Sequence, residues 1–380
     1  MKHLLEKVSL LALSAMLIST YSISAAIPYM LEVYPGQSVE LLISLPSFTI
    51  MAVLLGNRWL SHYLSEHQMI VLGLLCIGGF GMAPFWVQTY PFLVFSRLLL
   101  GLGVGLINAK AISIISEHFE GEERIQMLGY RGSAEVVGSS FLTLLVGVFL
   151  TIDWTWAFLI YGFAFLVLVL YLLFVPRVAE QEEEGELIHL SASQRGKASL
   201  YGLLAGLTVF VNTVVSMRLP VMVTGMGLGT ASQAGYVLSF QQLIGIASGL
   251  LFSLMLRWFG FRLGGLAYLG LGGTFLLMGS SHHFALLALG AIASGFFYSV
   301  SLTGIFYRIA DRTPASLINA ATAIVLLGCN LGSAFSPYLL KGLGVFLTSN
   351  SQIFLLLGGL LLALGAGWCL LARPAAGKKE

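Results

Sequence analysis

Long apolar runs follow one another along the whole sequence, and each is long enough to cross a lipid bilayer. A bilayer core takes about 20 apolar residues per helix. Only 9% of the residues are charged, against about a quarter in soluble proteins, so the outer surface must face lipid. We therefore expect an all-α polytopic membrane protein with twelve transmembrane helices, over residues 8–31, 39–60, 68–88, 91–116, 126–150, 154–175, 199–222, 232–256, 264–281, 284–308, 315–340 and 352–372.

One long polar insertion interrupts the series. It runs from Pro176 to Lys197 and carries five glutamates within seven positions, from Glu180 to Glu186. Such an acidic run cannot enter a bilayer and is typical of a solvated linker. The sequence predicts a six-helix bundle over residues 1–176, a cytoplasmic acidic linker over 177–198, and a second six-helix bundle with a short cytoplasmic tail over 199–380.

The distribution of lysine and arginine predicts the orientation. If the N-terminus is cytoplasmic, fourteen of the nineteen basic residues fall in the inner segments, four lie within helices, and only Lys341 lies outside. Basic residues accumulate on the cytoplasmic side of membrane proteins. We expect a multi-pass protein of the cell membrane with both termini in the cytoplasm.

The two predicted bundles share short matches at a nearly constant offset. Ser47-Phe48 matches Ser239-Phe240 at 192 positions, and "GSSF" at 138–141 matches "GSAF" at 332–335 at 194 positions. Two parallel halves of this kind form one of the transporter architectures, in which the substrate site lies between the halves near the midplane.

The segment "RLLLGLGVGLINAKAISIISEHFEGEER", which begins at Arg97, resembles the fourth-helix pattern of the major facilitator superfamily. "DWTWAF" at 153–158 resembles the start of that family's sixth helix, and Gly129, Gly138 and Gly147 retain part of the fifth-helix motif of its drug:proton antiporter branch. The resemblance implies a transporter that works by alternating access. It also implies gating-loop positions at the cytoplasmic ends of helices, here His62, in place of the usual aspartate, and Glu117, Arg124, Arg257 and Asp311.

Arg131 and Glu135 form the strongest ionisable pair inside a predicted helix. Their spacing of four residues places them on one helical face, and Glu135 is the only acidic residue well inside a predicted span. Burial favours the protonated carboxyl group and a neighbouring guanidinium favours the ionised one. The pair is a candidate for proton coupling, and a fixed structural ion pair is the alternative.

Other polar residues in the spans are candidates to line a substrate cavity. Thr20 and Ser24 lie on one face of the first helix, and Asn212 and Ser216 lie at the equivalent positions of the seventh. Arg97 either braces the first helix or meets the substrate. The complete set of cavity candidates is Thr20, Tyr21, Ser24, Arg97, Asn108, Asn212, Ser216, Arg218, Gln241, Gln242, Tyr298 and Asn330.

Two transport functions remain open. The first is proton-coupled efflux of a small or amphiphilic compound. The second is import or export of a small organic anion, because the deep cations Arg97, Lys110, Arg131 and Arg218 outnumber the one deep acid. The sequence contains no catalytic or phosphate-binding motif and no basic cluster typical of nucleic-acid binding. We expect a monomer in the bilayer that needs no metal or cofactor and that binds a small-molecule substrate and protons.

Overall fold

The structure is a computed structural model that describes residues 2–111, 113–176, 191–314 and 317–371. Within these ranges the chain forms helices and no strand. The elements before residue 177 are α1 (Lys2–Ala15), η1 (Ser19–Ala26), α2 (Ile27–Val33), α3 (Val39–Tyr63), α4 (Glu66–Met82), η2 (Ala83–Phe85), α5 (Tyr90–Lys110), α6 (Ser113–His118), α7 (Gly121–Phe149), η3 (Trp154–Gly162) and α8 (Phe163–Phe174).

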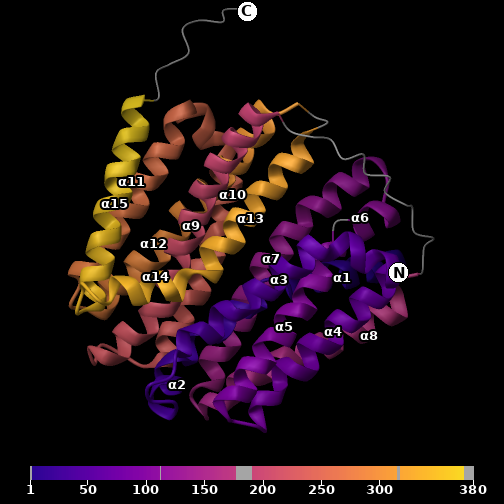
Figure 1. Cartoon of the computed structure of the whole chain (residues 1–380), viewed down its shortest axis with the longest axis horizontal. Coiled ribbons are helices and arrows are strands. Elements are labelled where there is room, and N and C mark those ends of the chain that lie inside the picture. The colour runs from indigo at the N-terminus through magenta and orange to yellow at the C-terminus, as the bar shows by residue number, and fades with distance from the viewer. Residues whose placement is uncertain (1, 112, 177–190, 315–316, 372–380) are drawn as a thin grey trace, which may run out of the picture.

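The elements after residue 190 form the second group. They are α9 (Ala192–Gly225), α10 (Ala231–Phe259), η4 (Gly260–Arg262), α11 (Leu263–Ser280), α12 (Phe284–Arg312), α13 (Ile318–Ala334), α14 (Ser336–Leu343) and α15 (Asn350–Leu371). Figure 1 shows α1–α8, in indigo to magenta, beside α9–α15, in rose to yellow. We call these two groups the N-half and the C-half.

The described helices account for twelve membrane spans. Nine stretches are long and apolar enough to cross a membrane, and two bent helix pairs bring the number to eleven. One of the nine, Ala231–Ser280, is 50 residues long, which as one helix at 1.5 Å per residue would be far longer than a bilayer is thick. It consists of α10 and α11, separated at Gly260, so it supplies two spans. The predicted fold class is confirmed.

Helix boundaries differ from the predictions where local capping decides them. The first span is bent by 50° between α1 and the η1–α2 segment, and the eleventh by 48° between α13 and α14, where Pro337 stands in the first turn of the new helix. Helix α9 begins at Ala192, earlier than the predicted residue 199, because Ser191 and Gln194 form a capping box. The acidic run of the predicted linker lies outside the described residues.

The glycines of α5 allow this helix to approach two neighbours closely. Gly101 and Gly105 face α3, where a Cβ added at Gly105 would lie 2.9 Å from Val53 Cβ. Gly103 faces α4, and its own added Cβ would lie 2.6 Å from the carbonyl oxygen of Gly73. Positions two apart on a helix point to nearly opposite sides. The alternating glycines therefore serve close packing on both faces of α5.

A similar crossing joins α9 and α13 in the C-half. Gly202 and Gly206 are four residues apart on α9, and Gly328 and Gly332 are four apart on α13. A Cβ added at Gly206 would lie 2.7 Å from the carbonyl oxygen of Gly328, so the two backbones touch. Small residues at this spacing are the usual means by which helices pack closely in membranes, where burial of apolar surface does not drive association.

Each span reverses the direction of the one before it, so the start of α1 and the end of α15 lie on one side of the bundle. We call the side at which α1 begins and α15 ends the termini side, and the other the far side. Residues near the starts of α3 and α10 and near the ends of α7 and α9 therefore lie toward the far side.

Candidate functional site

The N-half and the C-half contact each other in the far-side part of their helices. Ser140 of α7 and Ser239 of α10 exchange two hydrogen bonds, in which each hydroxyl donates to the other residue's carbonyl oxygen at 2.9 Å. One turn along, Gln242 Nε2 donates to Thr143 Oγ1 at 3.1 Å. We call this contact between α7 and α10 the first serine contact.

A second contact joins α3 to α13. The Ser47 and Ser333 hydroxyl groups lie 3.0 Å apart, and the Tyr21 hydroxyl of η1 contacts both. Just beyond, the ring of Phe48 meets that of Phe335 edge-on, with centroids 5.6 Å apart. We call this contact the second serine contact.

The two serine contacts are related by the internal repeat. Ser47 and Ser239 are separated by 192 positions, and Ser139 and Ser333 by 194. Under the repeat, α3 corresponds to α10 and α13 to α7, so the two contacts between the halves are equivalent, displaced by one residue from Ser139 to Ser140. The short matches found in the sequence are the segments through which the halves touch.

Neutral polar groups cluster just inside these contacts in the C-half. The buried Gln241 side chain donates from Nε2 to Asn212 Oδ1 and to Ser294 Oγ, both at 3.2 Å. Ser216 donates to the Asn212 carbonyl oxygen at 3.3 Å. Three of these four groups come from the predicted cavity set. Ser294 was not predicted, because a lone serine in an apolar run gives no signal of its own.

The remaining cavity candidates lie outside this hydrogen-bonded cluster. Thr20 and Ser24 are buried in η1, and Tyr298 of α12 lies near Tyr21. Asn330 donates to Leu326 of its own helix at 3.0 Å, and Asn108 is partly buried near the end of α5.

Arg131 and Glu135 form an ion pair at the middle of α7. Arg131 Nη2 lies 2.8 Å from Glu135 Oε1, and the two side chains are 18% and 19% exposed. The oxygen has no hydrogen bond of good geometry among the described groups. Glu135 is one turn from Ser139 and therefore lies on the termini side of the first serine contact. The carboxylate is held by one cation and is only partly shielded.

Arg97 is enclosed entirely within the N-half. The side chain is 0% exposed, and its Nη1 donates to the Tyr161 hydroxyl at 3.1 Å. Nη2 donates to the Gly81 carbonyl oxygen at 3.3 Å, and the guanidinium stacks over the rings of Phe158 and Tyr161. Tyr161 in turn donates to the carbonyl oxygen of Ser19 at 3.2 Å. Arg97 thus joins α5 to α4, η3 and η1.

Arg218 lies at the far-side rim between the halves. Its Nη1 pairs with Glu40 Oε1 of α3 at 3.0 Å, and the side chains are 17% and 20% exposed. Glu40 was not predicted, because it stands in the second position of its helix, where an acidic residue has an ordinary role beside the helix dipole.

The five gating-loop candidates all lie toward the termini side. His62, Arg124, Arg257 and Asp311 are exposed near helix ends, and Glu117 is partly buried in α6. The acidic group that the structure buries here is Glu66, 6% exposed, which accepts a hydrogen bond from the Ser113 hydroxyl at 2.8 Å. Glu66 thus joins α4 to α6. Its position is marked in the sequence only by the capping pair Ser65 and Gln68.

No group of three or more potential metal ligands occurs among the described residues. Cys76, Cys329 and Cys369 are unpaired thiols. The polar groups at the centre are hydroxyl and amide groups together with one ion pair. Such a set can bind a small solute through hydrogen bonds and aromatic contacts, and Glu135 can take up or release one proton.

Comparison with known proteins points to a transporter. The sequence profile of the Major Facilitator Superfamily matches residues 9–278. No curated protein matches the sequence significantly. A solved D-xylose–proton symporter superposes with a TM-score of 0.77 at 15% identity, over 98% of this chain and 99% of that one.

Two further structures have the same architecture. The nucleoside transporter NupG has a TM-score of 0.75 at 14% identity, over 97% of this chain and 100% of that one. An inward-facing bacterial homologue of the human lysosomal transporter Spinster has a TM-score of 0.75 at 13% identity, over 99% of both chains. At these identities the likeness establishes the fold.

Proposed function

Since the chain belongs to the Major Facilitator Superfamily, and is therefore a membrane transporter and not an enzyme, we propose that it carries out proton-coupled efflux of a small amphiphilic compound. The observation that carries this proposal is the Arg131–Glu135 pair at the middle of α7, the helix that also carries the first serine contact. An ionisable residue inside a span is costly unless it has a function or a partner. Here the partner is a single cation on the same helix.

Coupling follows from what a proton does to this pair. Protonation of Glu135 removes its attraction for Arg131 and frees a guanidinium on the helix that carries the first serine contact. A change of charge at that position alters the relative stability of the two conformations, which is what coupling requires. The proposal places this protein with the drug:proton antiporter branch that the fifth-helix glycines resemble.

The central polar groups support a neutral or amphiphilic substrate. Gln241, Asn212, Ser216 and Tyr21 offer uncharged hydrogen-bonding groups. The organic-anion alternative depended on an excess of deep cations. Arg131 and Arg218 each pair with a carboxylate, and Arg97 is buried against two acceptors and two rings, so these three offer little to an anion at the centre. Lys110 is the last residue of α5 and lies toward the termini side.

The proposed direction of transport depends on the orientation of the protein in the membrane. The excess of basic residues on the termini side favours a cytoplasmic location for both termini. The serine contacts then close the outer side, and the conformation is one that receives substrate from the cytoplasm, as efflux requires. We propose a monomer in the cell membrane whose partners are its substrate, protons and lipid.

Transport in proteoliposomes tests the coupling. A thermal-stability screen of purified protein with rhodamine 6G, ethidium and small organic acids first identifies a bound compound. We expect Glu135→Gln to reduce pH-driven transport of that compound by about tenfold or more while exchange without a gradient continues. The matched control is Glu123→Gln, which removes a carboxylate of the same helix that pairs with Lys7 at 2.5 Å, away from the contact between the halves.

The outcomes separate the alternatives. Loss of pH-driven transport in Glu135→Gln with coupling retained in Glu123→Gln supports the proposal. Unchanged coupling in Glu135→Gln contradicts it, and transport of organic acids into proteoliposomes without transport of the cationic dyes favours the anion transporter.

A further inference from the structure

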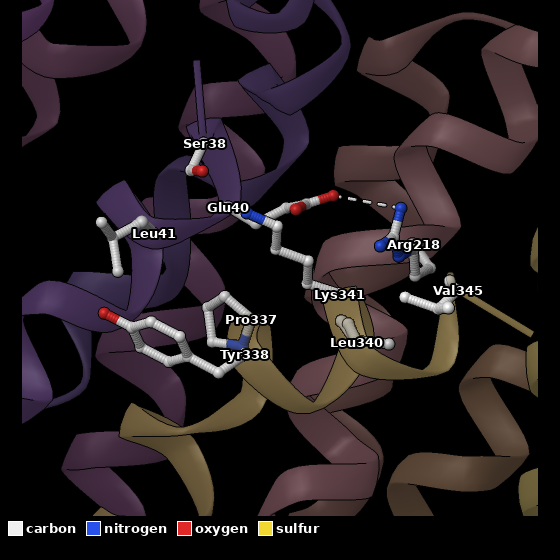
Figure 2. A pocket seen from close by; sticks show the side chains of 10 residues that line it. Ser38, Glu40, Leu41, Arg218, Pro337, Tyr338, Leu340, Lys341 and Val345 are labelled. Carbon is white, nitrogen blue, oxygen red and sulfur yellow. Dashed lines mark ion pairs between the residues drawn. The ribbon is translucent and has the colours of Figure 1, made fainter. Parts of the chain in front are cut away.

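A pocket of about 390 Å³ opens at the far-side rim, where α3, α9 and α14 meet. It is separate from the central polar cluster, and its size is within the range of small-ligand sites, about 300–1,000 Å³. The lining comes from both halves, as Figure 2 shows: Ser38, Glu40, Leu41, Arg218, Pro337, Tyr338, Leu340, Lys341, Gly344 and Val345.

The pocket contains more positive than negative charge. Arg218 and Lys341 are cations on the C-half, and Glu40 is the single anion, on the N-half. Glu40 pairs with Arg218 at 3.0 Å, and Lys341 extends from α14 toward Glu40 in Figure 2. Arg218 also keeps a buried Nε without a hydrogen-bond partner among the described groups. The single carboxylate of Glu40 therefore leaves the pocket with a net charge of +1, and the Arg218 Nε remains a buried donor that has no partner in the described part of the chain.

The rest of the lining is mostly apolar. Pro337 and Leu340 are buried in α14, and Leu41 and Val345 add aliphatic surface beside the Tyr338 ring. A ligand that matches this pocket carries one anionic group for the two cations and a short apolar tail for the side chains around them. A guanidinium binds a carboxylate through two parallel hydrogen bonds, so a carboxylate suits Arg218.

We propose that this pocket binds a small amphiphilic anion, a carboxylate with a short apolar tail, between Arg218 and Lys341. The anion competes with Glu40 for Arg218. Because Glu40 is on the N-half and both cations are on the C-half, binding replaces a bond between the halves with a bond inside one of them. The occupied pocket thus weakens the closure of the far side, and the ligand acts as a regulator of opening whether or not transport is coupled to protons.

Hexanoate is a suitable probe, with hexanamide as the uncharged control of equal length. Its dissociation constant is measured by thermal shift on the full-length protein in dodecyl maltoside. We expect hexanoate to bind and hexanamide not to bind. Lys341→Gln and Arg218→Gln each weaken hexanoate binding by about tenfold or more, since each removes a charge-assisted hydrogen bond.

Glu40→Gln gives the decisive result. Competition with Glu40 predicts that hexanoate binds this variant more tightly, whereas binding without competition predicts weaker or unchanged affinity. If Glu40 competes with the ligand, its neutralisation tightens hexanoate binding by about threefold. A factor of this size corresponds to the free energy of a partly exposed ion pair, which the ligand no longer has to break. Weaker or unchanged binding in Glu40→Gln overturns the proposed competition, and equal binding of hexanoate and hexanamide overturns the anion site. Each variant is first checked for an unchanged elution profile, so misfolding is recognised separately.

A lipid can offer the same chemistry as a free carboxylate. Nanodiscs of phosphatidylcholine are therefore compared with nanodiscs that also contain phosphatidylglycerol. If the site takes a soluble anion, hexanoate binds equally in both. If it takes a lipid anion, phosphatidylglycerol suppresses hexanoate binding in the wild type and has no effect in Arg218→Gln.

Discussion

At the scale of single residues, Arg97 shows how a charge is stabilised inside a membrane helix. Its guanidinium donates from two nitrogens and lies near two aromatic rings, a combination that an ammonium cannot reproduce. We expect Arg97→Lys to lower the free energy of unfolding by about 2–3 kcal/mol, and Tyr161→Phe, which removes one hydroxyl group, by about 1 kcal/mol. Thermal unfolding in detergent measures both.

Measurements of substrate binding distinguish a structural role of Arg97 from direct contact with the substrate. If Arg97 only holds α5 against α4 and η3, the folded fraction of both variants binds substrate with unchanged affinity. An Arg97→Lys protein of normal stability that has lost its affinity would contradict the structural role. The sequence left these two roles open, because an arginine in an apolar run has the same appearance in either case.

At the scale of elements, glycine pairs determine how helices cross. Gly328 lies on the backbone of Gly202 where α13 crosses α9, so Gly328→Val must push the helices apart. We expect this change to cost about 2–3 kcal/mol of stability. The matched control is Gly359→Val in α15, where an added Cβ meets nothing within 4 Å and the change should stay within about 0.5 kcal/mol. Equal losses in the two variants would contradict the crossing.

The spans were predictable from the sequence because hydropathy is a property of each segment alone. The bends were not, since the break between α13 and α14 depends on where Pro337 starts a new helix. The partners of polar residues were not predictable where they lie on another helix. The Arg131–Glu135 pair follows from spacing on one helix, whereas the Arg218–Glu40 pair joins residues 178 positions apart, which only the fold brings together.

At the scale of the whole molecule, the first serine contact offers a direct test of the closed side. The Ser140 and Ser239 hydroxyl oxygens lie 2.8 Å apart, so cysteines at both positions are close enough to form a disulfide. We expect Ser140→Cys with Ser239→Cys, in a background without Cys76, Cys329 and Cys369, to cross-link under oxidation and to lose transport. Reduction should restore it.

The single variants serve as controls, because each has only one thiol. A double variant that cross-links fully and still transports at the wild-type rate would show that the halves do not separate at this contact during turnover.

The chemistry of the two serine contacts has a thermodynamic consequence. Hydroxyl groups that leave one another on separation can bond to incoming water, so the net loss per bond is only about 1 kcal/mol. Each hydroxyl bond thus adds only a small amount to the closure of the far side, beside the Arg218–Glu40 pair and the Phe48–Phe335 contact, and weakening these bonds shifts the population toward separated halves. Temperature, pressure and solvent activity should then shift this population measurably even when no ligand is bound.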